Sequence, residues 1–356
     1  MDAKSLMVVV CCGLHTVADA QSYSVRDLGL EADIRSTQAL NNQGDVLVGI
    51  GSAGWSRAAV LQRSGQVRTL EGVSGMRSVA RGINDHGSVV GWLEDGGYGN
   101  GALWNSEGLL TIIEPQSEFL TVRPERISNS GLISGLTSAA NGTAVFLVSD
   151  GSMRTLGGPG GSLQVHYPIF VTSLSESGTI VGEERGVENP AVRSTWIWTE
   201  NSGFEVHSGG PYVSWNGYKY VNSVRAYAGF SKPNDAVWVE FNSVRQQTGL
   251  FGDLLGFNDL GQVLVKETTG AFRVWAGGQD FLLSDNDAGL VVTWCYDLND
   301  LGQVLVAGTR NGRETYAVLT PVPEPSTLTG LGSLVCLTIA RNVRRKRGRT
   351  MIEDVT

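Results

Sequence analysis

The sequence is poor in cysteine and histidine, with only four of each among its 356 residues. Cys11 and Cys12 lie in an apolar run near the start and Cys336 in another near the end. Cys295 alone remains between these runs, so no internal disulfide can form there. The histidines are never spaced as a zinc-ligand pair such as His-x-x-x-His. We therefore expect neither a bound metal nor a cofactor.

Basic residues are also scarce in the central part of the chain. The whole sequence has 27 basic and 35 acidic residues, but residues 1–20 and 326–356 hold seven of the basic and four of the acidic ones. The remaining body keeps 20 basic against 31 acidic residues. Such an acidic body lacks the basic surface that phosphate backbones require, which excludes nucleic acid as the expected partner.

The first 20 residues have the layout of a secretory signal peptide. Lys4 precedes the apolar run Leu6–Leu14, and Ala18 and Ala20 place small residues where signal peptidase cleaves. We therefore expect residues 1–20 to be removed on export. A buried N-terminal strand is the alternative, while lipid attachment at the two early cysteines lacks the small residues it needs.

The C-terminal 36 residues combine a proline-rich spacer, an apolar run and a basic cluster. Residues 321–326 contain the Pro323-Glu324-Pro325 motif, which prevents regular structure and predicts an accessible spacer. Residues 327–340 are predicted to be a short membrane-anchor helix, which flanking residues must lengthen for it to span a bilayer. The tail 341–356 is basic, which predicts a cytoplasmic stop signal. Its cluster is Arg341, Arg344, Arg345, Lys346 and Arg347.

This order of motifs resembles the PEP-CTERM sorting signal of bacterial surface proteins, although the tail runs past the arginines to Thr356. The resemblance implies an exosortase-type transpeptidase as a partner, which cuts near the Pro-Glu-Pro motif. It also implies a transient stay in the inner membrane, followed by a place at the cell surface or outside the cell. An uncut tail anchor is the alternative.

Residues 21–320 consist of a repeated motif, as in "ALNNQGDVLVG" from Ala39, "GINDHGSVVG" from Gly82 and "DLNDLGQVLVAG" from Asp297. Aligned copies place the first polar turn residue at intervals of 43, 44, 47, 47, 36 and 41 residues. The fifth copy carries Arg225 instead of its turn glycine. The seven turn residues are Asn41, Asn84, Ser128, Ser175, Asn222, Asn258 and Asn299.

Each copy contains short β-rich runs separated by Asn-Asp-x-Gly turns, which is typical of antiparallel hairpins. Four strands in about 43 residues form a propeller blade, so the count predicts an all-β, seven-bladed β-propeller. The last copy lacks its outer strand, and Ser22–Leu28 resembles the missing piece. We therefore expect this N-terminal strand to close the ring and remove an exposed sheet edge.

The pattern also resembles the HAF repeat of bacterial extracellular proteins. The resemblance spans Leu40 to Leu319, with a departure in the sixth copy, where Lys266 replaces a glycine. It implies an extracellular repeat domain, and we expect a monomer.

Polar residues in the repeats are explained better by turn structure than by chemistry. The pairs Asn84-Asp85, Asn258-Asp259 and Asn299-Asp300 could suggest a carboxylate metal ring, but Asn and Asp are favoured in such turns on their own. Residues 284–289 have the alternating oxygen donors of part of a calcium loop but lack the glutamate it needs. The adjacent pairs Glu94-Asp95 and Glu183-Glu184 would point to opposite faces of a strand, unlike the carboxylates of glycoside hydrolases.

Nine tryptophans are the most distinctive side chains of the body. Trp104, Trp198, Trp238 and Trp275 recur at one position of the repeat and are expected to pack between blades. Trp55, Trp92, Trp215 and Trp294 fall outside that position. If exposed, their rings could stack on sugars, so they are the candidate carbohydrate contacts.

Two functions follow from these features. The favoured one is an exported, non-catalytic surface module that binds exopolysaccharide or other matrix components, because no catalytic set of residues stands out and no catalytic residue is assigned. The alternative is a propeller lyase or hydrolase acting on an extracellular glycan. Clustering of His207, Glu183 or Glu184 at one mouth of the channel would favour the enzyme.

Overall fold

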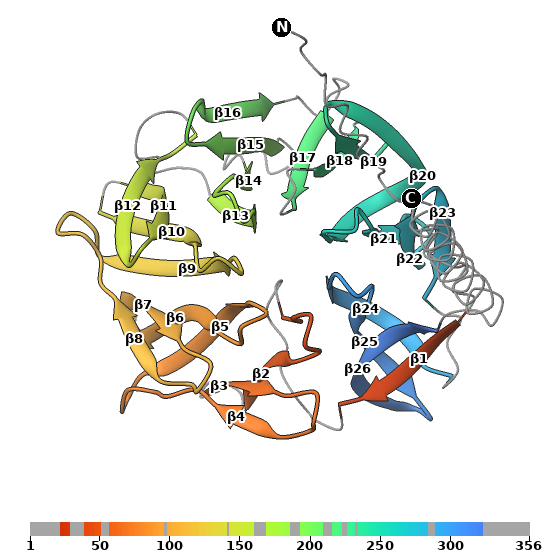
Figure 1. The fold of residues 1–356 in the computed structure, drawn as a ribbon, viewed down its shortest axis with the longest axis horizontal. Helices are drawn as coiled ribbons and strands as arrows, with labels where there is room; N and C mark the ends of the chain where they lie inside the picture. Colours follow the sequence, from red (N-terminus) through yellow and green to blue (C-terminus); the bar gives the residue numbers. More distant parts are fainter. Residues whose placement is uncertain are drawn as a thin grey trace, which may run out of the picture.

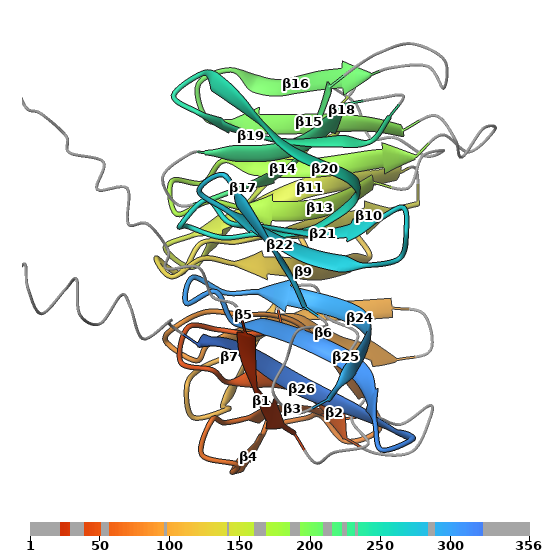
Figure 2. The ribbon, with the colours of Figure 1, turned by 90° about the vertical axis from the view of Figure 1, so that its right-hand side faces the viewer.

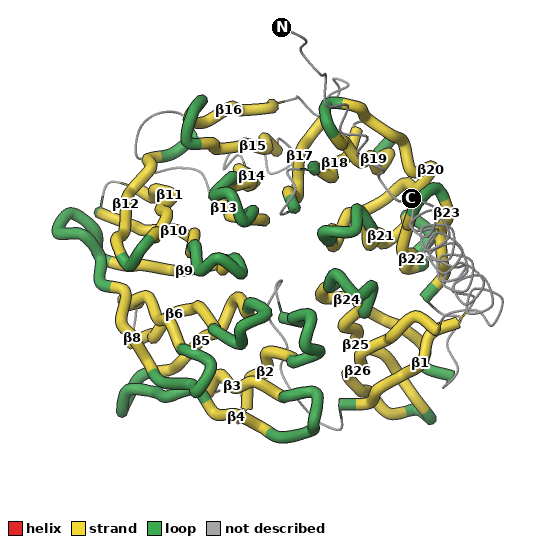
Figure 3. The backbone as a smooth tube through the Cα atoms, viewed as in Figure 1, coloured by secondary structure: helices red, strands yellow, loops and turns green. Residues whose placement is uncertain are grey.

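The computed structural model describes residues 22–28, 39–50, 57–95, 98–140, 142–159, 169–185, 193–208, 216–222, 226–231, 234–283 and 289–322. Several predictions therefore lie outside the described residues: the signal peptide with Ala18 and Ala20, the Pro-Glu-Pro motif, the span 327–340, the basic cluster, Trp55 and Trp215. Within the described ranges all regular structure is strand (Figure 3). None of this part of the chain forms a helix that could cross a membrane.

The described residues contain 26 strands, which form a ring of antiparallel sheets around a central axis (Figure 1). In the side view the strands run roughly along this axis (Figure 2). The first sheets along the chain are made of β2 (Val46–Ile50), β3 (Arg57–Leu61) and β4 (Val67–Thr69); of β5 (Arg77–Ile83), β6 (Val89–Asp95), β7 (Tyr98–Trp104) and β8 (Leu110–Ile113); and of β9 (Thr121–Ile127), β10 (Ile133–Ala139), β11 (Gly142–Ser149) and β12 (Ser152–Gly157).

The later sheets complete the ring. They are made of β13 (Ile169–Leu174), β14 (Ile180–Arg185), β15 (Arg193–Thr199) and β16 (Gly203–Ser208); of β17 (Asn216–Val221), β18 (Tyr227–Ser231), β19 (Ala236–Phe241), β20 (Val244–Phe257), β21 (Val263–Glu267), β22 (Phe272–Ala276) and β23 (Gln279–Leu282); and of β24 (Val291–Leu298), β25 (Val304–Arg310), β26 (Arg313–Val322) and β1 (Ser22–Asp27).

The prediction of seven separate and near-equal blades is wrong, while the predicted anchor helix lies outside the described residues. Hydrogen bonding gives six sheets: five are separate blades of three or four strands, and the sixth has seven strands. The seven-stranded sheet is continuous because β20 pairs with β19 through its first half and with β21 through its second half. Asn222 and Asn258 are only 36 residues apart, which leaves no room for a separate outer strand and connection.

The predicted closure by the N-terminal segment is confirmed. Strand β1 pairs with β26 in antiparallel register from Ser22 opposite Val322 to Asp27 opposite Ala317. Tyr23 is buried in the same cluster as Leu319 and Cys295. The first described segment therefore completes the last sheet and covers its edge.

Six of the innermost strands carry a bulge just before the turn. The extra residues are Arg81, Glu125, Thr172, Lys219, Leu255 and Tyr296. A bulge re-aims neighbouring side chains and often lies next to a functional site. The strand that pairs with the bulge at Arg81 needs a glycine at position 91. An added Cβ on Gly91 would lie 1.9 Å from the carbonyl oxygen of Val79. The sixth repeat has Lys266 instead of this glycine, and its glycine lies on the innermost strand, β20. A Cβ on Gly252 of that strand would lie 2.1 Å from the carbonyl oxygen of Lys266.

The core lies between neighbouring sheets. Trp104 shares a buried cluster with Val46 and Val48 of the first repeat and Leu305 of the last. Corresponding clusters join Trp198 to the third repeat and Trp275 to the fifth. The predicted packing role is thus confirmed for these three tryptophans, while Trp238 is fully buried with the Arg245 guanidinium carbon 3.9 Å from its ring centroid.

Candidate active site

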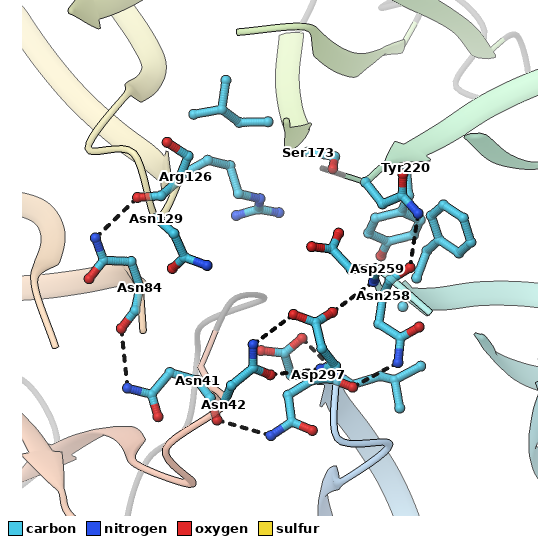
Figure 4. Close-up of a pocket in the computed structure, with 18 of the residues that line it drawn as sticks. Asn41, Asn42, Asn84, Arg126, Asn129, Ser173, Tyr220, Asn258, Asp259 and Asp297 are labelled. Carbon is cyan, nitrogen blue, oxygen red and sulfur yellow. Dashed lines mark hydrogen bonds between the residues drawn. The ribbon is translucent and has the colours of Figure 1, made fainter. Parts of the chain in front are cut away.

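One mouth of the central channel forms a cavity of about 160 Å³. Residues at or next to the repeated turns of all seven copies surround it (Figure 4). The turns converge because each one follows an innermost strand, so every repeat delivers its turn to the same end of the ring. The cavity lining includes the turn residues Asn41, Asn84, Ser128, Asn222, Asn258 and Asn299.

The turn asparagines form an inner ring of hydrogen bonds between repeats. Asn41 Nδ2 donates to the carbonyl oxygen of Asn84 at 3.1 Å, and Asn84 Nδ2 donates to that of Ser128 at 3.1 Å. On the other side, Asn222 donates to Asn258 at 3.2 Å and Asn258 to Asn299 at 2.8 Å. The third and fourth repeats have Ser128 and Ser175 as their turn residues. A serine has no amide donor, so these two repeats interrupt the ring of hydrogen bonds.

Each asparagine also holds its own turn. In the second repeat, Asn84 Oδ1 accepts from the backbone nitrogens of His86 at 3.1 Å and Ser88 at 2.9 Å. Gly87 has a φ of 76°, which favours glycine. The turn interpretation of the repeated Asn-Asp pairs is therefore confirmed. No group of three or more potential ligands among the described residues could hold a metal ion.

A second ring lies one residue further along each turn. Asp85 accepts from the backbone nitrogen of Asn42 at 2.7 Å, and Asn129 accepts from that of Asp85 at 2.8 Å. Glu176 then accepts from the backbone nitrogen of Asn129 at 2.7 Å. The ring also includes Asp300, whose pKa is raised because burial disfavours the carboxylate. These contacts make the mouth both rigid and acidic.

Three repeats place reactive side chains on this cavity, always two residues before the turn. They are Arg126, Tyr220 and Asp297, whereas the first, second and sixth repeats have only alanine or glycine at the corresponding position. The guanidinium of Arg126 points toward the middle of the cavity (Figure 4). A cation, a phenol and a carboxyl group therefore face one cavity from three different sheets.

Arg126 is only 7% exposed. Its Nε donates to the carbonyl oxygen of Thr172 and its Nη1 to that of Glu125, both at 2.9 Å. Burial lowers the pKa of the guanidinium, while the nearby acidic groups Glu125 and Asp297 oppose this shift. The bulge at Glu125 and the carbonyl of the next bulge thus hold the guanidinium in place.

Asp297 has an unusual acidity for an aspartate. Burial raises its pKa to about 6, although backbone nitrogens of Leu40 and Leu298 each donate to the carboxylate at 2.9 Å and partly counter the shift. The side chain therefore exchanges its proton near neutral pH, as a general acid or base must. Burial also raises the pKa of Tyr220, whose hydroxyl donates to the carbonyl oxygen of Leu255 at 2.7 Å and stays protonated.

The residues proposed as enzymatic markers from the sequence do not meet here. Glu183 and Glu184 lie on β14, the second strand of its sheet, and His207 lies on β16 at its outer edge. Glu183 Oε1 is 4.0 Å from Lys219 Nζ in an ion pair. None of the three lines the cavity. They therefore do not form the cluster at this mouth that would have favoured the enzyme on their account.

Two predicted carbohydrate contacts fall in the described residues. Trp92 is only 6% exposed, and the guanidinium carbons of Arg81 and Arg123 lie 4.9 Å and 5.6 Å from its ring centroid. It therefore offers no free face for a sugar. Trp294 is 40% exposed, with Lys266 Nζ 4.6 Å from its ring centroid, but it does not line the cavity.

Arg126, Tyr220 and Asp297 differ in residue type but share one position of the repeat. Aligning the repeats on their turns gives Ala39, Gly82, Arg126, Ser173, Tyr220, Gly256 and Asp297 two residues before the turn. Three other repeats have alanine or glycine at this position. The change to a large polar side chain was therefore the sequence feature that could have indicated the site. No search for catalytic pairs could have revealed them, since they lie far apart in the sequence.

No protein-family model matches the sequence, and no curated protein matches it. Solved structures do match. An oligogalacturonate lyase in complex with manganese has a TM-score of 0.53 and 11% identity, covering 85% of this chain and 96% of the lyase. An oligogalacturonate lyase from Vibrio parahaemolyticus gives the same score and identity, covering 85% of this chain and 95% of its own. A structure from a study of two prolyl endopeptidases has a TM-score of 0.57 and 11% identity, covering 86% of this chain and 48% of that one.

These similarities define the chain as a β-propeller protein. At such low identity the likeness shows the fold alone. The prediction that the chain is not an enzyme is withdrawn, because it rested on treating the ring as a binding module, and similar rings are found in lyases and in a study of prolyl endopeptidases.

Proposed function

We propose that this chain is a propeller enzyme, a lyase or hydrolase that cleaves an extracellular glycan in the turn-lined cavity. The observation that carries the proposal is the convergence of Arg126, Tyr220 and Asp297 on one cavity. These groups come from three sheets. Each also bonds the backbone of the next repeat, at Thr172, Leu255 and Leu40 respectively, so the same contacts that join the sheets hold the groups at the cavity. Titratable groups with shifted pKa values in a cavity are the usual mark of a catalytic site.

Both reactions need a group that exchanges a proton with the substrate. Asp297, with its pKa raised to about 6, can do so near neutral pH. Tyr220 supplies a hydroxyl that remains protonated, and Arg126 supplies a fixed positive charge to stabilise developing negative charge. The hydrogen-bonded turns hold these groups rigidly, which favours catalysis because little reorganisation is needed.

The sorting signals support a substrate outside the cytoplasm. We propose that residues 1–20 direct export and that an exosortase-type transpeptidase cuts near Pro325 after the segment 327–340 has held the chain in the inner membrane. The mature protein would then reach the cell surface or the medium, where exopolysaccharide and other matrix components are the available glycans. Mass spectrometry of protein recovered from the cells tests this step, because it predicts a new C-terminus near Pro325.

The enzymatic proposal is tested by incubating residues 21–322 with a panel of bacterial and plant polysaccharides and measuring new chain ends. We expect cleavage of at least one glycan, and we expect Asp297→Asn to lower the rate by about 100-fold or more. Asp150→Asn is the matched control, because Asp150 lies in an exposed turn, where its carboxylate accepts from the hydroxyl of the neighbouring Ser149. Absence of cleavage, or equal rates for both variants, would contradict the proposal.

A further inference from the structure

Arg126 is a buried cation whose hydrogen bonds do not neutralise its charge. Its acceptors, the carbonyl oxygens of Thr172 and Glu125, are neutral groups. Among the described residues no carboxylate forms an ion pair with Arg126 within 4.0 Å. Arg126 therefore places a positive charge, unpaired by any carboxylate of the described residues, at a site with only 7% exposure.

The two carboxyl groups whose charge acts most on Arg126, Glu125 and Asp297, are engaged elsewhere. The carboxylate of Glu125 lies 3.8 Å from Arg81 Nε in an ion pair, and Asp297 accepts hydrogen bonds from Leu40 and Leu298. A buried charge without a counter-ion is costly, so a ligand that brings an anionic group to this point is stabilised there. Guanidinium groups match the planar, two-oxygen geometry of carboxylates.

We propose that Arg126 is the receptor for a carboxylate on the sugar, so that the glycan cleaved in this cavity contains uronic acid units. This inference rests on the proposed function and names its substrate class. The surrounding acidic groups refine it. Asp85, Asp259 and Asp300 line the same mouth and would repel a continuous polyuronate. The cavity therefore suits a chain in which uronic acids alternate with neutral sugars.

A carboxylate held by Arg126 favours elimination over hydrolysis. Asp297, as the carboxylate, takes the proton from the carbon next to the bound carboxylate. The electron pair of that C–H bond becomes a C=C bond, the C–O bond to the leaving sugar breaks, and the leaving oxygen takes the Tyr220 hydroxyl proton. Proton transfer from Asp297 to the tyrosinate through solvent restores both groups, so neither water nor a redox partner is consumed. Arg126 stabilises the extra negative charge on the substrate carboxylate during proton removal.

The test measures binding before turnover. Titration calorimetry compares methyl glucuronoside with methyl glucoside, which differ only in the carboxylate, on the wild-type chain and on Arg126→Gln. We expect the uronoside to bind the wild type more tightly than the glucoside, and we expect Arg126→Gln to lose about 10- to 100-fold in uronoside affinity. Equal affinity for the two sugars, or unchanged uronoside binding by Arg126→Gln, would overturn the inference.

Two further measurements keep the outcomes distinguishable. If Arg126→Gln fails to fold, Arg126→Lys retains the charge but loses the two-nitrogen fork, and its uronoside affinity should still fall. Wild-type digestion of an alternating uronate glycan should give an unsaturated product, detected by its ultraviolet absorbance. Uronoside binding without cleavage of any glycan would overturn the proposed function alone. Cleavage of neutral glycans without selective uronoside binding would overturn this inference alone.

Discussion

Asn299 Nδ2, in the last repeat, donates a 3.0 Å hydrogen bond to the carbonyl oxygen of Asn41, in the first repeat, 258 residues earlier. The same bond joins four other pairs of neighbouring repeats, so the two ends of the repeat array meet as those neighbours do. At the outer edge of the last sheet, β1 and β26 make a second junction. The ring is therefore closed at two radii by segments distant in sequence.

The inner junction is tested by Asn299→Asp. This change keeps the acceptor of the turn but replaces the donor with an oxygen that faces the carbonyl of Asn41 and Gln303 Oε1. Because Asn299 is buried, we expect the free energy of unfolding to fall by about 1–3 kcal/mol in urea denaturation. Asn201→Asp, at an exposed turn, is the control and should change stability little.

The outer junction is tested by Tyr23→Ala. Tyr23 is 3% exposed and belongs to a cluster with Leu264, Cys295 and Leu319, so removing its ring leaves a cavity between β1 and the last sheet. We expect a loss of about 3–5 kcal/mol in the free energy of unfolding. Ser24→Ala on the same strand removes only a 3.3 Å hydrogen bond and should cost about 1 kcal/mol or less. Similar losses for both variants would show that closure does not depend on this packing.

Much of the fold was predictable because the repeat reports directly on local structure. The turn asparagines, the recurring tryptophans and the closing strand β1 all lie where the alignment places them. The continuous sheet through β20 was not predicted, although the 36-residue step between Asn222 and Asn258 marks the place. The short spacing between these two turns shows that the repeat lacks some residues. Only the strand pairing shows that the outer strand of one repeat and the inner strand of the next form the single strand β20.

The site was less accessible to sequence analysis. Asn41 and Asn84 could be assigned to turns, but their second role, donation to the next repeat, depends on how neighbouring sheets are oriented. The raised pKa of Asp297 depends likewise on burial at the mouth of a closed ring. The hydrogen bonds between repeats and the pKa of Asp297 both depend on how several repeats pack together. They therefore cannot be predicted from the sequence of one repeat.

The interrupted part of the inner ring can be repaired. Ser175 is 1% exposed, and its hydroxyl accepts from the backbone nitrogen of Thr179 at 3.0 Å, as the asparagines do in their own turns. Ser175→Asn keeps an acceptor and adds an amide donor toward the next repeat. We expect the midpoint of urea denaturation to rise, corresponding to about 1 kcal/mol. Ser202→Asn, in an exposed turn, is the control, and destabilisation by Ser175→Asn would show that this interface has a different geometry.

The pH dependence of cleavage reports the role of Asp297. Its pKa is raised to about 6, so the carboxylate form predominates above that pH. If Asp297 removes a proton from the substrate, kcat/KM should rise through about pH 6 and level off above it. A fall in kcat/KM above pH 6 would instead identify Asp297 as a proton donor and contradict its role as the base.

The location of the active site is tested most directly by a crystal structure of Asp297→Asn soaked with an oligosaccharide that the wild-type chain cleaves. We expect ligand density in the cavity ringed by the repeated turns, with a sugar carboxylate on the guanidinium of Arg126 and the scissile linkage beside residue 297. Density on the outer face of the ring or around Trp294, with the turn-lined cavity empty of ligand, would contradict this location.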